Sequence, residues 1–126
     1  LKTDAADWPW WRGPSRNGIA DPNQDPPTEW TDQKNIVWKS PIPGRGHGSP
    51  TIVANRIFLA TADETNGSQS VICFDRATGE QKWLTVIHAT GLMKKNEKSS
   101  GASSTLACDG ERVFINFVND GSMDVT

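Results

Sequence analysis

The sequence predicts an all-β fold of four-stranded antiparallel sheets, preceded by an irregular segment rich in tryptophan and proline. Three observations predict it: dense proline and glycine at the start, short β-rich runs separated by turn residues from residue 36 onward, and an internal repeat. The single helix candidate, residues 88–98, is weakened by Gly91 and Asn96. We therefore expect β-structure almost throughout.

Composition excludes several classes of protein. The 126 residues include 13 basic and 15 acidic ones, for a net charge of −2. This balance argues against a nucleic-acid-binding arm and against a polybasic membrane patch. The longest apolar runs are four residues, whereas a transmembrane helix needs about 20. The chain begins with Leu1 rather than methionine, so we expect a processed or cut product.

Residues 1–35 are expected to form an irregular segment that packs on the remainder, residues 36–126. Proline and glycine at this density forbid a helix and discourage a central strand. Four of the six tryptophans occur here, at positions 8, 10, 11 and 30. A solvated linker would not carry so much aromatic surface, so we expect these side chains to pack against the body of the protein. A sugar-stacking surface is the alternative.

The expected strands have apolar side chains on both faces. The β-rich runs are residues 36–39, 51–54, 56–62, 70–75, 81–87, 104–108 and 112–119. In the run 56–62, Ile57 and Leu59 point to one side, and Phe58 and Ala60 point to the other. A sheet with one solvated face would alternate apolar and polar residues. These sheets are therefore expected to be covered on both faces.

An internal repeat predicts what covers them. Thr-Ile-Val-Ala at 51–54 matches Thr-Leu-Ala-Cys at 105–108, an offset of 54, and Arg-Ile-Phe-Leu at 56–59 matches Arg-Val-Phe-Ile at 112–115, an offset of 56. Asn-Gly-Ser at 66–68 matches Asp-Gly-Ser at 120–122, again offset by 54. Trp38 and Trp83 precede the two copies and are 45 residues apart, so the period is about 45 residues with an insertion near 88–102. Such a period with four short strands is typical of a β-propeller blade.

The repeat predicts about one complete blade and part of a second. No counterpart of residues 74–83 follows the second copy before Thr126. Because propellers typically have about four to eight blades, we expect an N-terminal fragment of a longer protein. A self-contained sandwich of 126 residues is the alternative. The expected partners are further blades or a symmetry-related copy of the chain.

Residues 73–83, Cys-Phe-Asp-Arg-Ala-Thr-Gly-Glu-Gln-Lys-Trp, resemble the tryptophan-docking repeat of the quinoprotein alcohol dehydrogenase-like (PQQ-like) β-propellers. That repeat reads Ala-x-Asp-x-x-Thr-Gly-Lys-x-x-Trp, and Asp75, Thr78, Gly79 and Trp83 match it, whereas positions 73 and 80 differ. The resemblance implies that Trp83 docks between adjacent blades and that Asp75 and Thr78 hold the turn together. Turn chemistry independently predicts a positive φ at Gly79 and backbone donors on the Asp75 carboxylate. We expect Trp83 to be mostly buried.

The segments at 8–18 and 38–50 resemble the start of large secreted bacterial members of this family. The resemblance implies a periplasmic or extracellular protein whose signal peptide has been removed. We expect a non-catalytic propeller segment with a binding or scaffolding role and no cofactor in this chain. The alternatives are a fragment of a pyrroloquinoline-quinone-dependent alcohol dehydrogenase, which would use that quinone and calcium, and an accessory propeller of a multidomain enzyme. The dehydrogenases use adjacent cysteines, whereas Cys73 and Cys108 are 35 residues apart and are expected to be buried thiols.

The candidate ligand-binding residues are Arg45, His47 and Ser49, in the sequence Gly-Arg-Gly-His-Gly-Ser at 44–49. This segment lacks the Gly-Lys-Ser/Thr ending of a phosphate-binding loop. We expect its glycines to carry the chain across to an inner strand, with the three side chains at the mouth of the ring, where propeller ligands usually bind. An ordinary hydrogen-bonded loop histidine is the alternative for His47.

Other polar groups give no catalytic or metal-binding pattern. The two histidines lie in separate segments without zinc-ligand spacing. The serines at 99–104 lack a recognisable base and orienting acid. Asp63, Glu64 and Asp120 are explained by hairpin turns, and Lys94, Lys95 and Lys98 by a solvated loop face. Whether the protein is an enzyme is left open by the sequence.

Overall fold

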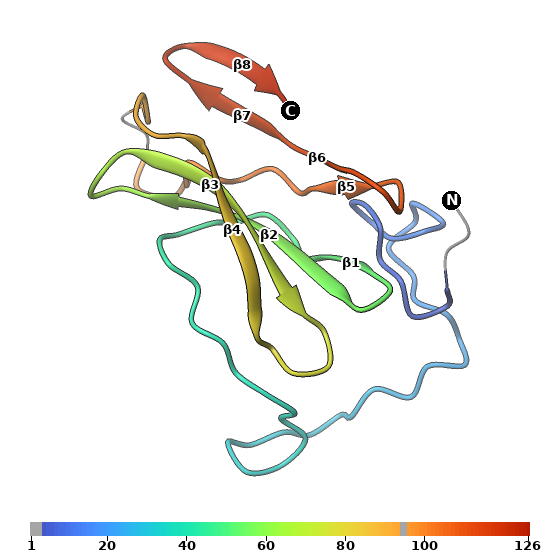
Figure 1. The fold of residues 1–126 in the computed structure, drawn as a ribbon. Coiled ribbons are helices and arrows are strands. Elements are labelled where there is room, and N and C mark those ends of the chain that lie inside the picture. Colours follow the sequence, from blue (N-terminus) through green and yellow to red (C-terminus); the bar gives the residue numbers. More distant parts are fainter. Residues whose placement is uncertain (1–3, 94–95) are drawn as a thin grey trace.

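Eight β-strands make up the regular structure of residues 4–93 and 96–126, the part of the chain that the computed structural model describes (Figure 1). Strands β1 (Thr51–Val53), β2 (Arg56–Asp63), β3 (Ser68–Asp75) and β4 (Gln81–His88) form a four-stranded antiparallel sheet in chain order. Two hairpins follow, β5 (Ala107–Cys108) with β6 (Val113–Phe114), and β7 (Asn116–Asn119) with β8 (Ser122–Val125). No helix occurs in these residues, so the predicted all-β class with a four-stranded antiparallel sheet is confirmed.

One expected strand is absent, another is shorter than expected, and the weakened helix candidate forms no helix. Residues 36–39 form no strand, and Ile36 and Val37 are exposed. The described part of residues 88–98 contains no helix, because His88 ends β4 and Gly91 adopts a φ of 87° that breaks a helix. The run expected at 104–108 contributes only β5 to the regular structure. Lys94 and Lys95 of the expected basic loop face lie outside the described residues.

Strands β2 and β3 of the first sheet are buried on both faces, as their alternation predicts. In the β2–β3 register, Phe58 lies opposite Cys73, and Leu59 lies opposite Ile72. We call the side that contains the first pair the front face and the side that contains the second pair the back face. All four residues but Leu59 are buried, and Leu59 is half-buried. The front-face residues are Phe58, Ala60, Ala62, Val71 and Cys73.

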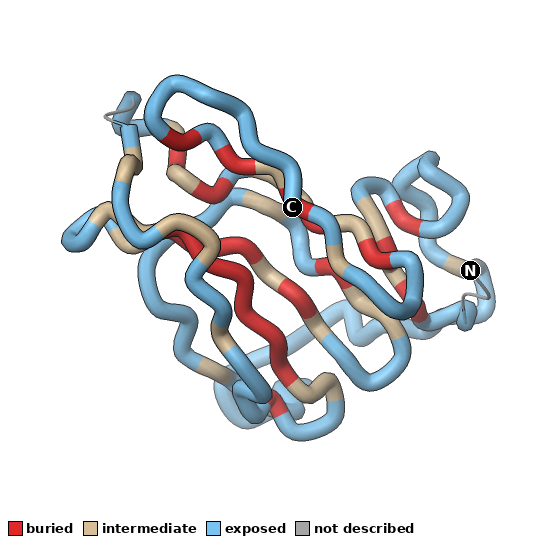
Figure 2. Tube along the Cα trace, turned by 45° about the horizontal axis from the view of Figure 1, so that its top comes forward, coloured by how far each residue is buried: buried red, intermediate tan, exposed pale blue. Residues whose placement is uncertain are grey.

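The front face is covered by the C-terminal hairpins. Its residues form one buried core cluster with Leu106, Cys108, Ile115 and Phe117. Figure 2 shows buried positions on both layers where they face one another. We call residues 51–88 unit 1 and residues 105–126 unit 2. The core therefore lies between two packed sheet layers that belong to the two copies of the sequence repeat.

The two copies also share their hairpin register. Asn119 pairs with Ser122 at the β7–β8 turn. In the sequence repeat, Asn119 aligns with Asp63 and Ser122 aligns with Ser68. Asp63 and Ser68 pair with each other in the same way at the β2–β3 turn. The second turn is tighter, with positive φ at both Asp120 (44°) and Gly121 (79°), as a two-residue hairpin turn requires. Both turns lie where the sequence places them.

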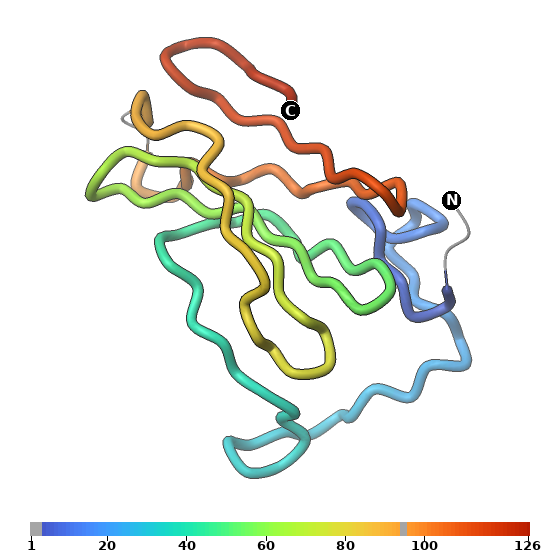
Figure 3. The backbone as a smooth tube through the Cα atoms, viewed as in Figure 1, coloured from blue at the N-terminus to red at the C-terminus, as the bar shows by residue number. Residues whose placement is uncertain are grey.

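The N-terminal segment joins the two units along one edge. Trp8 exchanges two backbone hydrogen bonds with Ile52 of β1, at 2.7 and 2.9 Å, and the Pro9 carbonyl accepts a hydrogen bond of 2.8 Å from the Cys108 amide of β5. The buried Asp7 carboxylate accepts a hydrogen bond from the Ala54 amide. Burial in the irregular segment is confined to residues 7–13, and residues 14–35 are almost entirely exposed along the outer path of Figure 3.

Candidate functional site

The segment 44–49 lies against neighbouring backbone because every second residue is glycine. A Cβ atom on Gly46 would lie 2.4 Å from the Ala60 carbonyl oxygen, and one on Gly48 would lie 2.2 Å from the Ser104 carbonyl oxygen. Real Cβ atoms do not approach backbone so closely, so both positions require glycine. The expected role of these glycines, to let two backbones approach, is confirmed.

The structure places Arg45, His47 and Ser49 in one exposed row between these glycines. The Arg45 backbone pairs with Ala62 of β2, whereas the amide of His47 bonds to the Ala102 carbonyl at 2.9 Å. The row therefore follows the seam where unit 1 meets the segment that leads into unit 2. Arg45 Nη2 donates to the Glu97 carbonyl at 3.2 Å.

The three side chains are not brought together into a closed site. No hydrogen bond or ion pair joins them to one another within residues 4–93 and 96–126, and the His47 imidazole has no such partner there either. Beside the row lies a recess of about 290 Å³, lined by Ile42, Leu59 and the glycine backbone. The arrangement offers an open row of donors beside an apolar recess, suited to contact with a ligand or partner surface.

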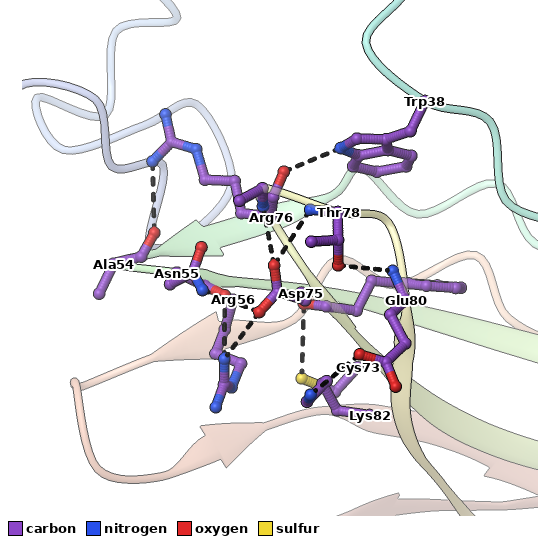
Figure 4. Close-up of polar contacts among 12 residues, drawn as sticks. Trp38, Ala54, Asn55, Arg56, Cys73, Asp75, Arg76, Thr78, Glu80 and Lys82 are labelled. Atoms are coloured by element: carbon purple, nitrogen blue, oxygen red, sulfur yellow. Dashed lines mark hydrogen bonds and ion pairs between the residues drawn. The ribbon is translucent and has the colours of Figure 1, made fainter.

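The Asp75 turn is a second cluster of polar contacts (Figure 4). Asp75 Oδ1 accepts hydrogen bonds from the amides of Ala77 at 3.0 Å and Thr78 at 3.1 Å, and the Gly79 amide donates to the Asp75 carbonyl. Gly79 has a φ of 72°, so both predictions for this turn are confirmed. Desolvation alone would raise the pKa of Asp75, but the hydrogen bonds from Thr78 and Ala77 outweigh it and the pKa lies below its usual value.

The second carboxylate oxygen of Asp75 ties this turn to the β1–β2 turn, which the sequence did not reveal. Oδ2 accepts a hydrogen bond of 2.8 Å from the Asn55 side-chain amide and lies 3.7 Å from Arg56 Nη1. Both contacts are drawn in Figure 4. One carboxylate therefore fixes the β3–β4 and β1–β2 turns at the same end of the sheet.

The indole that packs on this turn is Trp38, not Trp83. Trp38 Nε1 donates to the Arg76 carbonyl at 2.9 Å, and a Cβ atom on Gly79 would lie 2.5 Å from the Trp38 ring. Ser40 Oγ adds a hydrogen bond to the Gly79 carbonyl. Trp38 is the residue that the repeat aligns with Trp83, so a signal for this contact was present in the sequence.

Trp83 lies on the front side and is more exposed than a tryptophan docked between two sheets should be. Its ring centroid lies 5.9 Å from that of Phe58, and 38% of the residue is exposed. The cause is its position on β4, the outer strand of the sheet, where no residue is fully buried. Unit 2 covers β2 and β3, which carry the buried core, and leaves most of β4 open.

A buried amide pair links the two units, and sequence reasoning missed it. Gln69 of β3 is fully buried, and its Nε2 donates to the carbonyls of Gly101 at 2.7 Å and Val118 at 3.1 Å. Asn119 of β7 donates to Gln69 Oε1 at 3.0 Å and to the Thr90 carbonyl at 2.8 Å. The sequence did contain a signal for this pair: Gln69 lies in the otherwise buried strand β3, and a buried amide side chain needs several hydrogen-bond partners.

The remaining candidates add no reactive group. Cys73 and Cys108 are buried and unpaired, and burial raises the pKa of both thiols. Ser100 and Ser103 bond to each other. Within the described residues, no group of three or more histidine, cysteine or carboxylate side chains could hold a metal ion. No helix there is long and apolar enough to cross a membrane.

No protein-family model, no curated protein and no solved structure matches the chain. The geometry of the described residues and the repeat therefore carry the functional argument.

Proposed function

We propose that this chain is a non-catalytic β-propeller segment of an exported bacterial protein. Its role is scaffolding or binding, and its two repeat units are parts of successive propeller blades. The observation that carries the proposal is the packing of unit 2 on the front face of unit 1, since the two layers are copies of one sequence repeat. Stacked repeats of this kind are stabilised mainly by contacts with their neighbours.

The inner strands of the two units support a propeller arrangement. Thr51 Oγ1 donates to the Leu106 carbonyl at 2.6 Å, and Thr105 Oγ1 accepts from the Ser49 amide at 3.0 Å. The repeat aligns these two threonines with each other. Thr51 therefore links the start of unit 1 to unit 2, and Thr105 links the start of unit 2 to the segment that leads into unit 1. Such contacts are expected where innermost strands lie side by side around a common axis.

The proposed binding role rests on the exposed row formed by Arg45, His47 and Ser49. Because these side chains lie where unit 1 meets the segment that leads into unit 2 and are not joined to each other, they suit contact with a partner surface better than catalysis. The assignment to an exported bacterial protein rests on the resemblance of residues 8–18, 38–50 and 73–83 to the PQQ-like propeller family.

The rotation that relates the two units tests the proposal. In a propeller of about four to eight blades, neighbouring blades are related by roughly 45–90° about an axis beside the inner strands. An experimental structure in which such a rotation superposes β2–β3 on β7–β8 would support the proposal. An angle near 30° with no common axis beside β1 and β5 would identify an aligned sandwich instead and overturn it.

A further inference from the structure

The β2–β3 turn contains the sequence Asn66-Gly67-Ser68, which has the Asn-x-Ser/Thr pattern of an N-glycosylation acceptor. No other asparagine of the chain is followed by serine or threonine at the second position. Asn66 is exposed in this turn, which lies at the end of the sheet opposite the Asp75 turn (Figure 1). A bulky glycan needs such a surface position.

The geometry of the turn leaves the side-chain nitrogen of Asn66 available. Asn66 Oδ1 accepts a hydrogen bond of 2.9 Å from the Ser68 amide, so the side chain is held across the acceptor sequence. Gly67 between them has a φ of 75°, and its amide donates to the Asp63 carbonyl. Within residues 4–93 and 96–126, neither Asn66 Nδ2 nor the Ser68 hydroxyl has a hydrogen-bond partner. Both groups that define the acceptor sequence are therefore accessible to an enzyme.

We propose that Asn66 is an N-glycosylation site. The step forms a bond between Asn66 Nδ2 and C1 of a sugar carried on a lipid pyrophosphate. The bond from C1 to the pyrophosphate oxygen breaks, the lipid pyrophosphate leaves, and Nδ2 gives up a proton to the transferase. Bacterial oligosaccharyltransferases also select an acidic residue two positions before the asparagine, and Glu64 occupies that position. The inference rests on the export assumed in the proposed function, because this transfer takes place on exported proteins.

Two other turns of the chain share part of this arrangement and serve as internal comparisons. Asn17 Oδ1 accepts a hydrogen bond of 2.9 Å from the Ile19 amide, but Ile19 has no hydroxyl group. In unit 2, the repeat aligns Asp120 with Asn66, so a carboxylate stands where the acceptor nitrogen would be. Of the three turns, the one at Asn66 combines the amide with the hydroxyl.

Glycan transfer to the purified, folded chain tests the site. The chain is incubated with a bacterial oligosaccharyltransferase and its lipid-linked oligosaccharide, and the digested peptides are analysed by mass spectrometry. We expect the added mass of one glycan on the peptide that contains Asn66 and none on the peptide that contains Asn17. Asn66→Asp removes Nδ2 and keeps Oδ1 for the Ser68 amide, and it should abolish transfer, as should Ser68→Ala. Asn17→Gln is the matched control and should leave transfer unchanged.

Three outcomes overturn the inference: an unmodified wild-type chain, a glycan at another asparagine, or undiminished transfer to Ser68→Ala. Asn66→Asp is expected to fold, because aspartate occupies the aligned position of unit 2, and circular dichroism of each variant checks this. An unmodified chain whose units keep the propeller rotation would leave the proposed function intact. A chain glycosylated at Asn66 but lacking that rotation would keep the site and overturn the propeller, so the two failures are distinguishable.

Discussion

Replacing Gln69 with methionine removes the polar centre of the contact between the units while keeping nearly the same side-chain length. Three hydrogen bonds are lost: two that Nε2 donates to Gly101 and Val118, and one that Oε1 accepts from Asn119. At roughly 0.5–1.5 kcal/mol net for each bond, the free energy of unfolding should fall by roughly 1.5–4.5 kcal/mol. The upper half of that range is expected, because Gln69 is fully buried and its partner Asn119 is buried as well.

Urea unfolding measures this loss of free energy. An unchanged m-value, the slope of the free energy of unfolding against urea concentration, shows that wild type and variant unfold in the same transition. Asn119→Ala removes two bonds, to Gln69 and Thr90, and the double variant should lose less than the sum of the single losses by roughly 0.5–3 kcal/mol. Gln81→Met on the exposed start of β4 is the matched control and should change stability by less than about 0.5 kcal/mol. A loss below about 1 kcal/mol for Gln69→Met, or additive single losses, would show that the Gln69–Asn119 pair does not stabilise the contact between the units.

The close approach at Gly46, the Asp75 carboxylate and the Trp38 indole can each be tested by one substitution. Gly46→Ala should destabilise by about 1–3 kcal/mol in denaturant titration, because its Cβ would meet the Ala60 carbonyl at 2.4 Å; a neutral result would contradict the close approach. The pKa of Asp75 is lowered in the folded protein, so its carboxylate stabilises the fold above the unfolded pKa of about 3.9, and this stabilisation is lost as the pH falls through the folded pKa. The free energy of unfolding of the wild type should therefore exceed that of Asp75→Asn by less and less below about pH 4. A difference that stays constant with pH would contradict this prediction. Trp38→Ala should cost about 3 kcal/mol and clearly more than Trp83→Ala, because Trp38 packs on the turn whereas Trp83 is 38% exposed; equal losses would show that the Trp38 contact does not form.

Local chemistry explains what the sequence could predict. The two-sided apolar alternation of β2 and β3 required cover on both faces, and the structure supplies it. The Asp75–Gly79 turn followed from side chains that bond to nearby amides and from a glycine that tolerates positive φ. The alternating glycines before β1 were recognised for the same reason, because close backbone approach depends on a missing Cβ atom and not on distant partners.

Features that depend on distant partners were not predictable. The Gln69–Asn119 pair joins residues 50 positions apart, and periodicity carries no information about which buried amide meets which. Trp83 was expected to be buried because it is large, but the edge position of β4 decides its exposure. The open geometry of the row formed by Arg45, His47 and Ser49 follows from how residues 97–105 pack beside it, and the local sequence carries no information about that packing.

Unit 2 covers the front face of unit 1 through its Ile115–Phe117 side. Nuclear Overhauser effects in solution test this packing. We expect cross-peaks from the Phe117 ring to the methyl groups of Ala60, Ala62 or Val71, the front-face members of the shared core. Cross-peaks from these methyl groups to Val118 or Val125 instead, or none between the units, would contradict it.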